Sequence, residues 1–254
     1  MALSSRALAV VALLVTLTAC DHPEPPAPTY PPRIQYNTRW IPNPSADLMS
    51  PEGTFVRAAV ESWTGAHMSY KHGVDALLDG GYPGFERAYQ AAYGKQRGNK
   101  PDEYGGKGFG IPSSNGRWQV GTMYYEIVGF RRDGDRMTAD VCEYDNMVAT
   151  RQSDGTYASH GSNLGAGTSY TFGPDPSIAE QHAPPAKQRG PAARPTDDVF
   201  GSWVVLDYAN PPDRGAACQK LAPGTPPDWP NPYTRSNPPP TLPPDPGWPA
   251  GSSA

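Results

Sequence analysis

The chain has 254 residues, of which 32 are proline and 27 are glycine, and its formal net charge at neutral pH is −4. So much proline and glycine predicts that a large part of the chain is loop rather than packed helix or strand. A mildly acidic chain without a basic run lacks the electrostatic footprint of nucleic-acid-binding proteins. We therefore expect no nucleic-acid partner.

The N-terminus predicts export and lipidation. A basic Arg6 precedes an apolar run, residues 7–17, which is too short to span a bilayer as a helix but is typical of a signal peptide. The run ends in "LTAC", which resembles the lipobox of bacterial lipoproteins. The resemblance implies that residues 1–19 are removed and that Cys20 is lipidated, anchoring the chain to the extracytoplasmic side of the cell membrane. The alternative is an ordinary secreted protein with an unmodified cysteine.

Proline enrichment divides the rest of the chain into three parts. Residues 20–49 are predicted to form an extended, proline-rich stalk, because such segments favour polyproline conformation. Residues 50–222 have the length of one domain. Residues 223–254 contain twelve prolines and are predicted to be a disordered tail.

Cysteine usage predicts one disulfide. With Cys20 assigned to lipidation, an exported chain retains only Cys142 and Cys218, and we expect these two to be bonded. The alternative is a metal site, which would need more Cys or His residues at short spacing than the sequence contains. We therefore expect no metal and no cofactor.

Helical signals come first in the domain. Serine as a cap, proline at the first position and an acid in the first turn make Ser50-Pro51-Glu52 a helix start, and helical apolar spacing extends it to about Lys71. A short apolar turn is expected at residues 74–78, and a further helix begins at Pro83. The glycine-rich residues 94–116 are predicted to be a flexible connector; the alternative, a nucleotide-binding loop, lacks the required spacing.

The spacing of the apolar residues then changes from the helical period to the two-residue alternation of strands. Two strand-like stretches flank Asp133-Gly134-Asp135, a strong hairpin signal, and residues 199–208 predict a third, buried strand. The loop at residues 182–195 is predicted to be disordered. An unbroken hairpin would place on one face Tyr124, Val128, Phe130, Met137, Ala139 and Val141. It would place on the other face Met123, Tyr125, Ile127, Thr138, Asp140, Cys142 and Tyr144.

Helices followed by an antiparallel hairpin and a buried strand predict an α+β fold, with N-terminal helices packed on a curved antiparallel sheet. The stretches "SPEGTFVRAAVESWTGAHMSY", "MTADVCEYDN" and "GSWVVLDY" resemble exported actinobacterial lipoproteins and the cone-shaped fold named after nuclear transport factor two. That resemblance implies helices over the concave face of the sheet, often with a pocket between them. Both enzymes and non-enzymes have this fold, so the fold alone does not decide the function.

Residues for chemistry are few. The expected pocket residues are His67, Tyr70, Tyr125, Asp140 and Tyr144. Glu126 and Glu143 are expected to share a sheet face and to form a carboxylate pair with separated pKa values. A structural role accounts for each of these residues better than a catalytic one, and no zinc-protease, serine-triad or Cys-His motif is present.

These observations favour a non-catalytic binding or assembly module that is anchored to the membrane and meets an apolar ligand or a protein of the cell envelope. One alternative is an enzyme that performs acid–base chemistry on a small apolar molecule. Another is a carrier of lipid or a different apolar ligand. An enclosed, mostly apolar pocket would favour the two alternatives.

Overall fold

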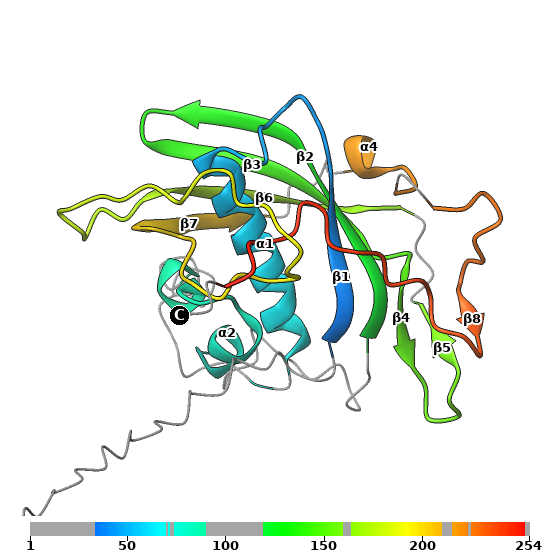
Figure 1. Ribbon diagram of the computed structural model, residues 1–254. Helices are drawn as coiled ribbons and strands as arrows, with labels where there is room; N and C mark the ends of the chain where they lie inside the picture. Colours follow the sequence, from blue (N-terminus) through cyan, green and yellow to red (C-terminus); the bar gives the residue numbers. More distant parts are fainter. Residues whose placement is uncertain are drawn as a thin grey trace, which may run out of the picture.

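The computed structural model describes residues 34–69, 71, 74–89, 119–159, 164–209, 215–222 and 225–251 (Figure 1). Several predictions lie outside them: the signal peptide, Cys20, the first part of the stalk, Tyr70 and the glycine-rich connector.

The described residues form an α+β fold in which helices pack on one sheet, as predicted (Figure 1). The sheet is open, and its strands follow the order β7-β6-β3-β2-β4-β5-β8, with β1 pairing to β2. The β1–β2 pairing is parallel and all others are antiparallel. The strands are β1 (Ile34–Ile41), β2 (Gln119–Asp133), β3 (Arg136–Tyr144), β4 (Val148–Arg151), β5 (Tyr157–Ala158), β6 (Ala166–Pro174), β7 (Trp203–Ala209) and β8 (Thr234–Arg235).

The long helix α1 (Pro51–Met68) begins where the sequence predicted. The Ser50 hydroxyl accepts a hydrogen bond from the Gly53 amide at 3.0 Å, and Pro51 occupies the first turn. The expected apolar turn is the short helix α2 (Val74–Gly80), residues 85–89 are helical, and α4 (Gly215–Cys218) follows β7. A Cβ atom at Gly80 would lie 2.2 Å from the carbonyl oxygen of Gly65, so glycine permits α2 to approach α1 closely.

The hairpin is confirmed, but the predicted faces are wrong. Asp133 pairs with Arg136 around Gly134, whose φ of 58° suits a tight hairpin turn. Farther along, Ile127 pairs with Val141 whereas Gly129 pairs with Asp140, so Val128 is an extra residue in β2. This bulge reverses the side-chain alternation of β2 between its two halves.

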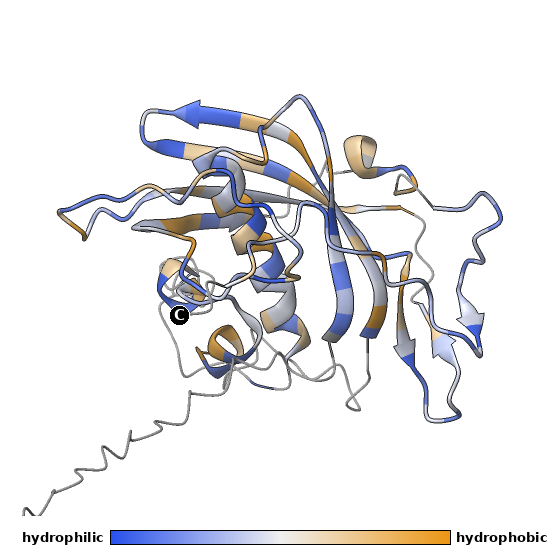
Figure 2. Cartoon of the chain, viewed as in Figure 1, coloured by the Kyte–Doolittle hydropathy of each residue, from blue (hydrophilic) through white to orange (hydrophobic). Residues whose placement is uncertain are grey.

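One sheet face is covered by α1 and holds the main core, and we call it the helix-covered face; the other is the outer face. Both α1 and the long strands carry apolar as well as polar residues (Figure 2). The bulge places on the helix-covered face Met123, Tyr125, Ile127, Phe130, Met137, Ala139 and Val141. A smaller cluster on the outer face contains Tyr124, Cys142, Tyr144, Met147, Cys218 and Ala222, with Val128 packed against it.

The predicted disulfide is present. Cys142 in β3 is bonded to Cys218 at the end of α4, and both residues are buried in the outer-face cluster. The bond closes a loop of sequence separation 76 and ties the second strand of the hairpin to the segment after β7. On the chain-entropy model, closing a loop of this length contributes about 4 kcal/mol to stability.

The predicted boundaries at residues 49 and 223 are wrong, because both flanking segments belong to the folded domain. Residues 34–41 of the expected stalk form β1, which lies beside β2. Residues 225–251 of the expected tail run back across β1 and pack on the sheet (Figure 1). The Trp40 amide donates to the carbonyl oxygen of Asp245 at 2.6 Å, and Trp248 is 1% exposed. Burial of aromatic rings and backbone pairing offset the conformational entropy that favours disorder.

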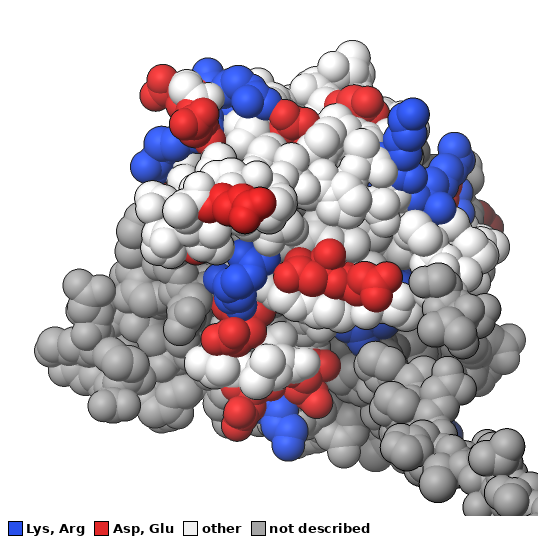
Figure 3. Space-filling view, turned by 60° about the vertical axis from the view of Figure 1, so that its left-hand side comes forward, with Lys and Arg blue, Asp and Glu red and all other residues white. Residues whose placement is uncertain are grey.

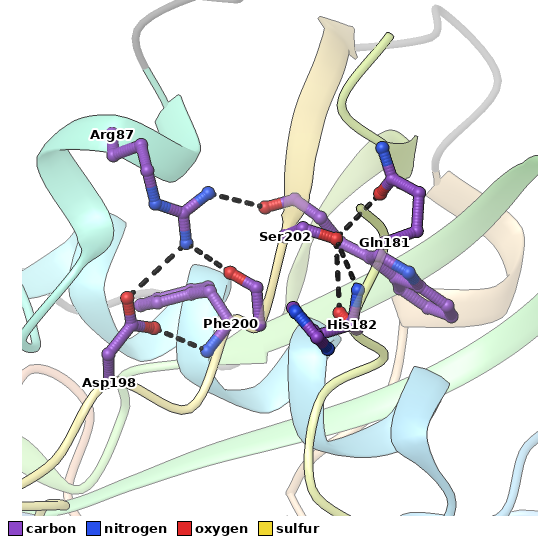
Figure 4. A network of polar contacts seen from close by, with 8 residues as sticks. Arg87, Gln181, His182, Asp198, Phe200 and Ser202 are labelled. Carbon is purple, nitrogen blue, oxygen red and sulfur yellow. Dashed lines mark hydrogen bonds and ion pairs between the residues drawn. The ribbon is translucent and has the colours of Figure 1, made fainter. Parts of the chain in front are cut away.

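The loop at residues 182–195 is also ordered, contrary to prediction. The Ser202 hydroxyl donates to the Gln181 side chain at 2.6 Å and accepts from the His182 amide at 2.8 Å (Figure 4). Arg87 donates to the carbonyl oxygen of Gly201 and contacts Asp198 at 3.3 Å. The His182 imidazole does not contact the serine in this network, so these contacts fasten the loop rather than form a catalytic dyad.

Candidate functional site

A chain of hydroxyl groups and one carboxyl group lies between α1 and the helix-covered face. The Tyr125 hydroxyl donates to Thr64 Oγ1 at 2.8 Å, and Thr64 Oγ1 donates to Glu143 Oε2 at 3.3 Å. Tyr125 and Glu143 are direct neighbours in the β2–β3 ladder, and the bulge at Val128 brings them to this face. Tyr125, a predicted pocket residue, and Glu143, a member of the predicted carboxylate pair, thus meet at one site.

Aromatic rings surround this polar chain. Tyr170 and Tyr208, paired across β6 and β7, lie edge to face with centroids 5.3 Å apart. Trp63 stacks on Tyr208 at 5.3 Å and on His67 at 5.2 Å, so a three-ring stack extends from β7 to the end of α1. We use "Glu143 cluster" for Thr64, Tyr125, Glu143, Tyr170 and Tyr208.

Electrostatics make Glu143 the most unusual group of this cluster. Burial disfavours its charged form and, with repulsion from Asp145, raises its pKa from 4.5 to about 7. Burial also raises the pKa of Tyr125 and Tyr170, so these phenols stay protonated near neutral pH. His67 is exposed, but burial of part of its ring lowers its pKa, which favours the neutral imidazole. Glu143 is therefore the group of this cluster that changes protonation near neutral pH.

Replacing Glu143 with glutamine is expected to reduce the pH dependence of stability. The carboxyl group titrates near pH 4.5 in the unfolded chain and near pH 7 in the folded one, so the folded state binds more protons within that window. The wild-type free energy of unfolding therefore falls as the pH rises from 4.5 to 7, by up to about 3 kcal/mol from this group. Urea unfolding at both ends of the window measures the difference between wild type and Glu143→Gln.

The matched control for this measurement is Glu180→Gln, because the Glu180 side chain is 85% exposed. It should follow the wild-type pH profile. An identical profile for Glu143→Gln and wild type would contradict the raised pKa of Glu143.

Two of the predicted pocket residues, Asp140 and Tyr144, lie on the outer face, so the predicted site is wrong in this respect. The Tyr144 hydroxyl donates to Glu126 Oε2 at 3.1 Å. Asp140 contacts Arg131 and accepts from the Ser169 hydroxyl at 2.5 Å; burial alone would raise its pKa, but these partners hold it below its usual value. Glu126 and Glu143 point to opposite faces because adjacent residues of a strand alternate, so they do not form the predicted carboxylate pair.

Sequence reasoning missed a second buried carboxylate, Glu61, in the middle of α1. It accepts hydrogen bonds from Trp40 Nε1 at 2.6 Å, from Trp248 Nε1 at 3.0 Å and from the Tyr82 hydroxyl. Arg57, one turn earlier and fully buried, donates to three backbone carbonyls of other segments. The i, i+4 spacing of the arginine and the glutamate was the available signal. Because these polar atoms are engaged in contacts between segments, we assign the pair to the fold.

Two hollows share Tyr82 and Arg194 in their linings, and Tyr82 donates to Glu61. One, of about 420 Å³, is bordered by α2 and by residues 194–196; the other, of about 170 Å³, lies between the start of β1 and Glu61. On the face shown in Figure 3, acidic and basic side chains form small separate groups among uncharged residues. Among the described residues, no group of three or more His, Cys, Asp or Glu side chains is suited to hold a metal ion.

Comparisons of the chain with protein-family models, with curated proteins and with solved structures found no match. Within the described ranges, no helix combines the length and apolar character that crossing a bilayer requires.

Proposed function

We propose that the chain is a non-catalytic binding module of the cell envelope, held to the extracytoplasmic side of the membrane by a lipidated Cys20. In this proposal it is an exported lipoprotein whose domain is related to the nuclear-transport-factor-two cone. Its ligand contacts the Glu143 cluster on the helix-covered face.

One observation carries the proposal: Glu143 is a partly buried carboxyl group that has no ion pair among the described residues. By contrast, Glu61, Glu126 and Asp140 are all engaged in contacts that hold segments together. A desolvated carboxyl group is costly unless a partner satisfies it. Bordered by phenol rings, it would suit a small ligand with an apolar or aromatic body and a hydrogen-bond donor or a cation.

Ligand-observed NMR tests this proposal with a panel of small amines and hydroxylated aromatic compounds. A compound that binds the wild type should lose at least about tenfold in affinity with Glu143→Gln, since a hydrogen bond to a charged group is worth about 1.5–3 kcal/mol. Glu180→Gln should bind like the wild type. Equal binding by all three proteins, or binding by none, would contradict it. The anchor is tested separately, because Cys20→Ser should shift the protein from the membrane fraction to the soluble fraction.

The second candidate is an enzyme that performs acid–base chemistry on a small apolar molecule. The observation that favours it is the pKa of Glu143, about 7, since a group that titrates near neutral pH is best suited to both accept and donate protons. Turnover of a bound compound, abolished in Glu143→Gln, would select this function over simple binding.

A further inference from the structure

On the outer face, one buried carboxylate contacts both an amine and a carboxamide. Glu126 is 3% exposed. Its Oε1 accepts a hydrogen bond from Asn43 Nδ2 at 2.8 Å, and its Oε2 lies 2.6 Å from Lys220 Nζ. Asn43 follows β1 and Lys220 follows α4, so residues from opposite ends of the domain meet on the two oxygens of a single side chain.

The residues after Asn43 polarise its carboxamide toward attack by a nucleophile and protect it from deamidation. The Ser45 amide donates to Asn43 Oδ1 at 2.9 Å, which polarises the carbonyl in the same way as an oxyanion-hole donor. The intervening residue is Pro44, which has no N–H group. Attack of the next backbone nitrogen on the carboxamide, the usual route by which asparagine is lost, is therefore blocked.

The surroundings hold Glu126 in place and limit its contact with water. The Tyr144 hydroxyl donates to Oε2 at 3.1 Å, and the apolar side chains of Tyr124, Ile41 and Val128 belong to the same cluster. Burial alone would raise the pKa of Glu126, while Lys220 and Asn43 lower it. Glu126 is thus shielded from water, whereas the Lys220 side chain is 45% exposed.

We propose that Lys220 and Asn43 become joined by an intramolecular amide bond, with Glu126 as the catalytic proton carrier. Lys220 Nζ attacks Cγ of Asn43 after Glu126 has accepted a proton from Nζ. Glu126 returns that proton to Nδ2 and the Cγ–Nδ2 bond breaks. The second proton, which Nζ loses as the amide forms, also passes to the leaving nitrogen. Because lysine starts as an ammonium, the product leaves as an ammonium ion and Glu126 is regenerated, so charge and atoms balance without a further reactant.

Placement of both reactants on one fixed carboxylate supplies the main rate advantage. Well-oriented intramolecular reactions reach effective concentrations of about 10⁵–10⁸ M, and a positioned general acid–base contributes a further factor of about 10²–10⁴. The new bond would lie beside the disulfide, since Glu126 pairs with Cys142 in the sheet and Lys220 is two residues from Cys218. It would join the end of β1 covalently to the segment after α4.

Intact-mass spectrometry of the reduced full chain, with its N-terminal modification assigned by peptide mapping, tests the proposal. The expected mass is lower than that of the sequence by one NH₃, and proteolysis should yield one branched peptide containing Lys220 and Asn43. Asn43→Asp should instead lose one H₂O, which identifies the carbonyl partner. The full sequence mass, persisting after long incubation of the folded protein at alkaline pH, would overturn the proposal.

Two conservative variants distinguish loss of the amide bond from loss of folding. Lys220→Arg keeps a cation against Glu126 but cannot form this amide, so it should retain the full mass with an unchanged circular dichroism spectrum. Glu126→Gln keeps the shape but cannot carry the proton, and the cross-linked fraction should fall from nearly all to nearly none. A mass deficit that persisted in either variant would contradict the assigned residues.

Discussion

Replacing Arg57 with methionine is expected to lower the free energy of unfolding by about 3–5 kcal/mol, because it removes the buried donor of three hydrogen bonds and a cation whose charge acts on Glu61. Arg57 is fully buried and donates to the carbonyl oxygens of Gln188 at 2.7 Å, Pro246 at 2.7 Å and Gly247 at 3.0 Å. Its guanidinium also lies 4.3 Å above the ring of Trp248. Methionine fills a similar volume but leaves three carbonyls without this donor and Glu61 without its neighbouring cation.

The charge on Glu61 can be tested within the same experiment. Burial raises the pKa of Glu61, and the positive charge of Arg57 opposes that rise. Adding Glu61→Gln to Arg57→Met should therefore recover about 1 kcal/mol or more, because the uncompensated charge disappears. Arg189→Ala is the matched control, since its side chain is 71% exposed and should change stability by less than about 0.5 kcal/mol. The urea midpoints of the four proteins give these differences in stability. A loss below about 1 kcal/mol for Arg57→Met would show that the buried contacts of Arg57 do not stabilise the fold.

Features set by local sequence were predicted correctly. The start of α1 depends on Ser50 and Pro51, and the hairpin turn depends on Gly134, so neighbouring residues were enough to identify them. The disulfide followed from counting cysteines in an exported chain. In β1, Tyr36, Thr38 and Trp40 alternate with polar residues, but the prolines on both sides masked this strand signal. In β6, glycine and serine masked a similar one.

The side-chain register of the hairpin was predicted incorrectly. The bulge at Val128 lets both halves of the hairpin bury apolar residues on the helix-covered face. Gly129, the next residue, was a local signal for a bulge inside a strand, and the prediction did not use it.

The effect of the bulge on the site is large: it brings Tyr125 and Glu143 together and separates Glu143 from Glu126. A hairpin without the bulge would place Tyr125 on the same face as Asp140 and Tyr144, as the sequence analysis expected. Asp140 and Tyr144, which were placed in the predicted pocket, therefore lie on the outer face instead.

A chain that ends at Ala222 is expected to lose cooperative folding, although the sequence predicted that the domain ends there. The deletion removes Trp248, whose ring is 1% exposed and whose Nε1 donates to Glu61. It also removes Asp245, which exchanges backbone hydrogen bonds with Thr38 and Trp40 along β1. Losing one buried tryptophan costs about 3–5 kcal/mol, and whole domains are stable by only about 5–15 kcal/mol.

Far-UV circular dichroism during urea unfolding measures the outcome without depending on tryptophan signals. The truncated chain should show a broad or absent transition, whereas a chain that ends at Gly251 keeps every described contact and should match the full chain. Trp248→Ala in the full chain should lie between them, with a sharp transition shifted to lower urea. If the chain ending at Ala222 unfolded at the wild-type midpoint, the C-terminal segment would be an appendage, and the contacts of Arg57 with Pro246 and Gly247 would contribute nothing to the fold.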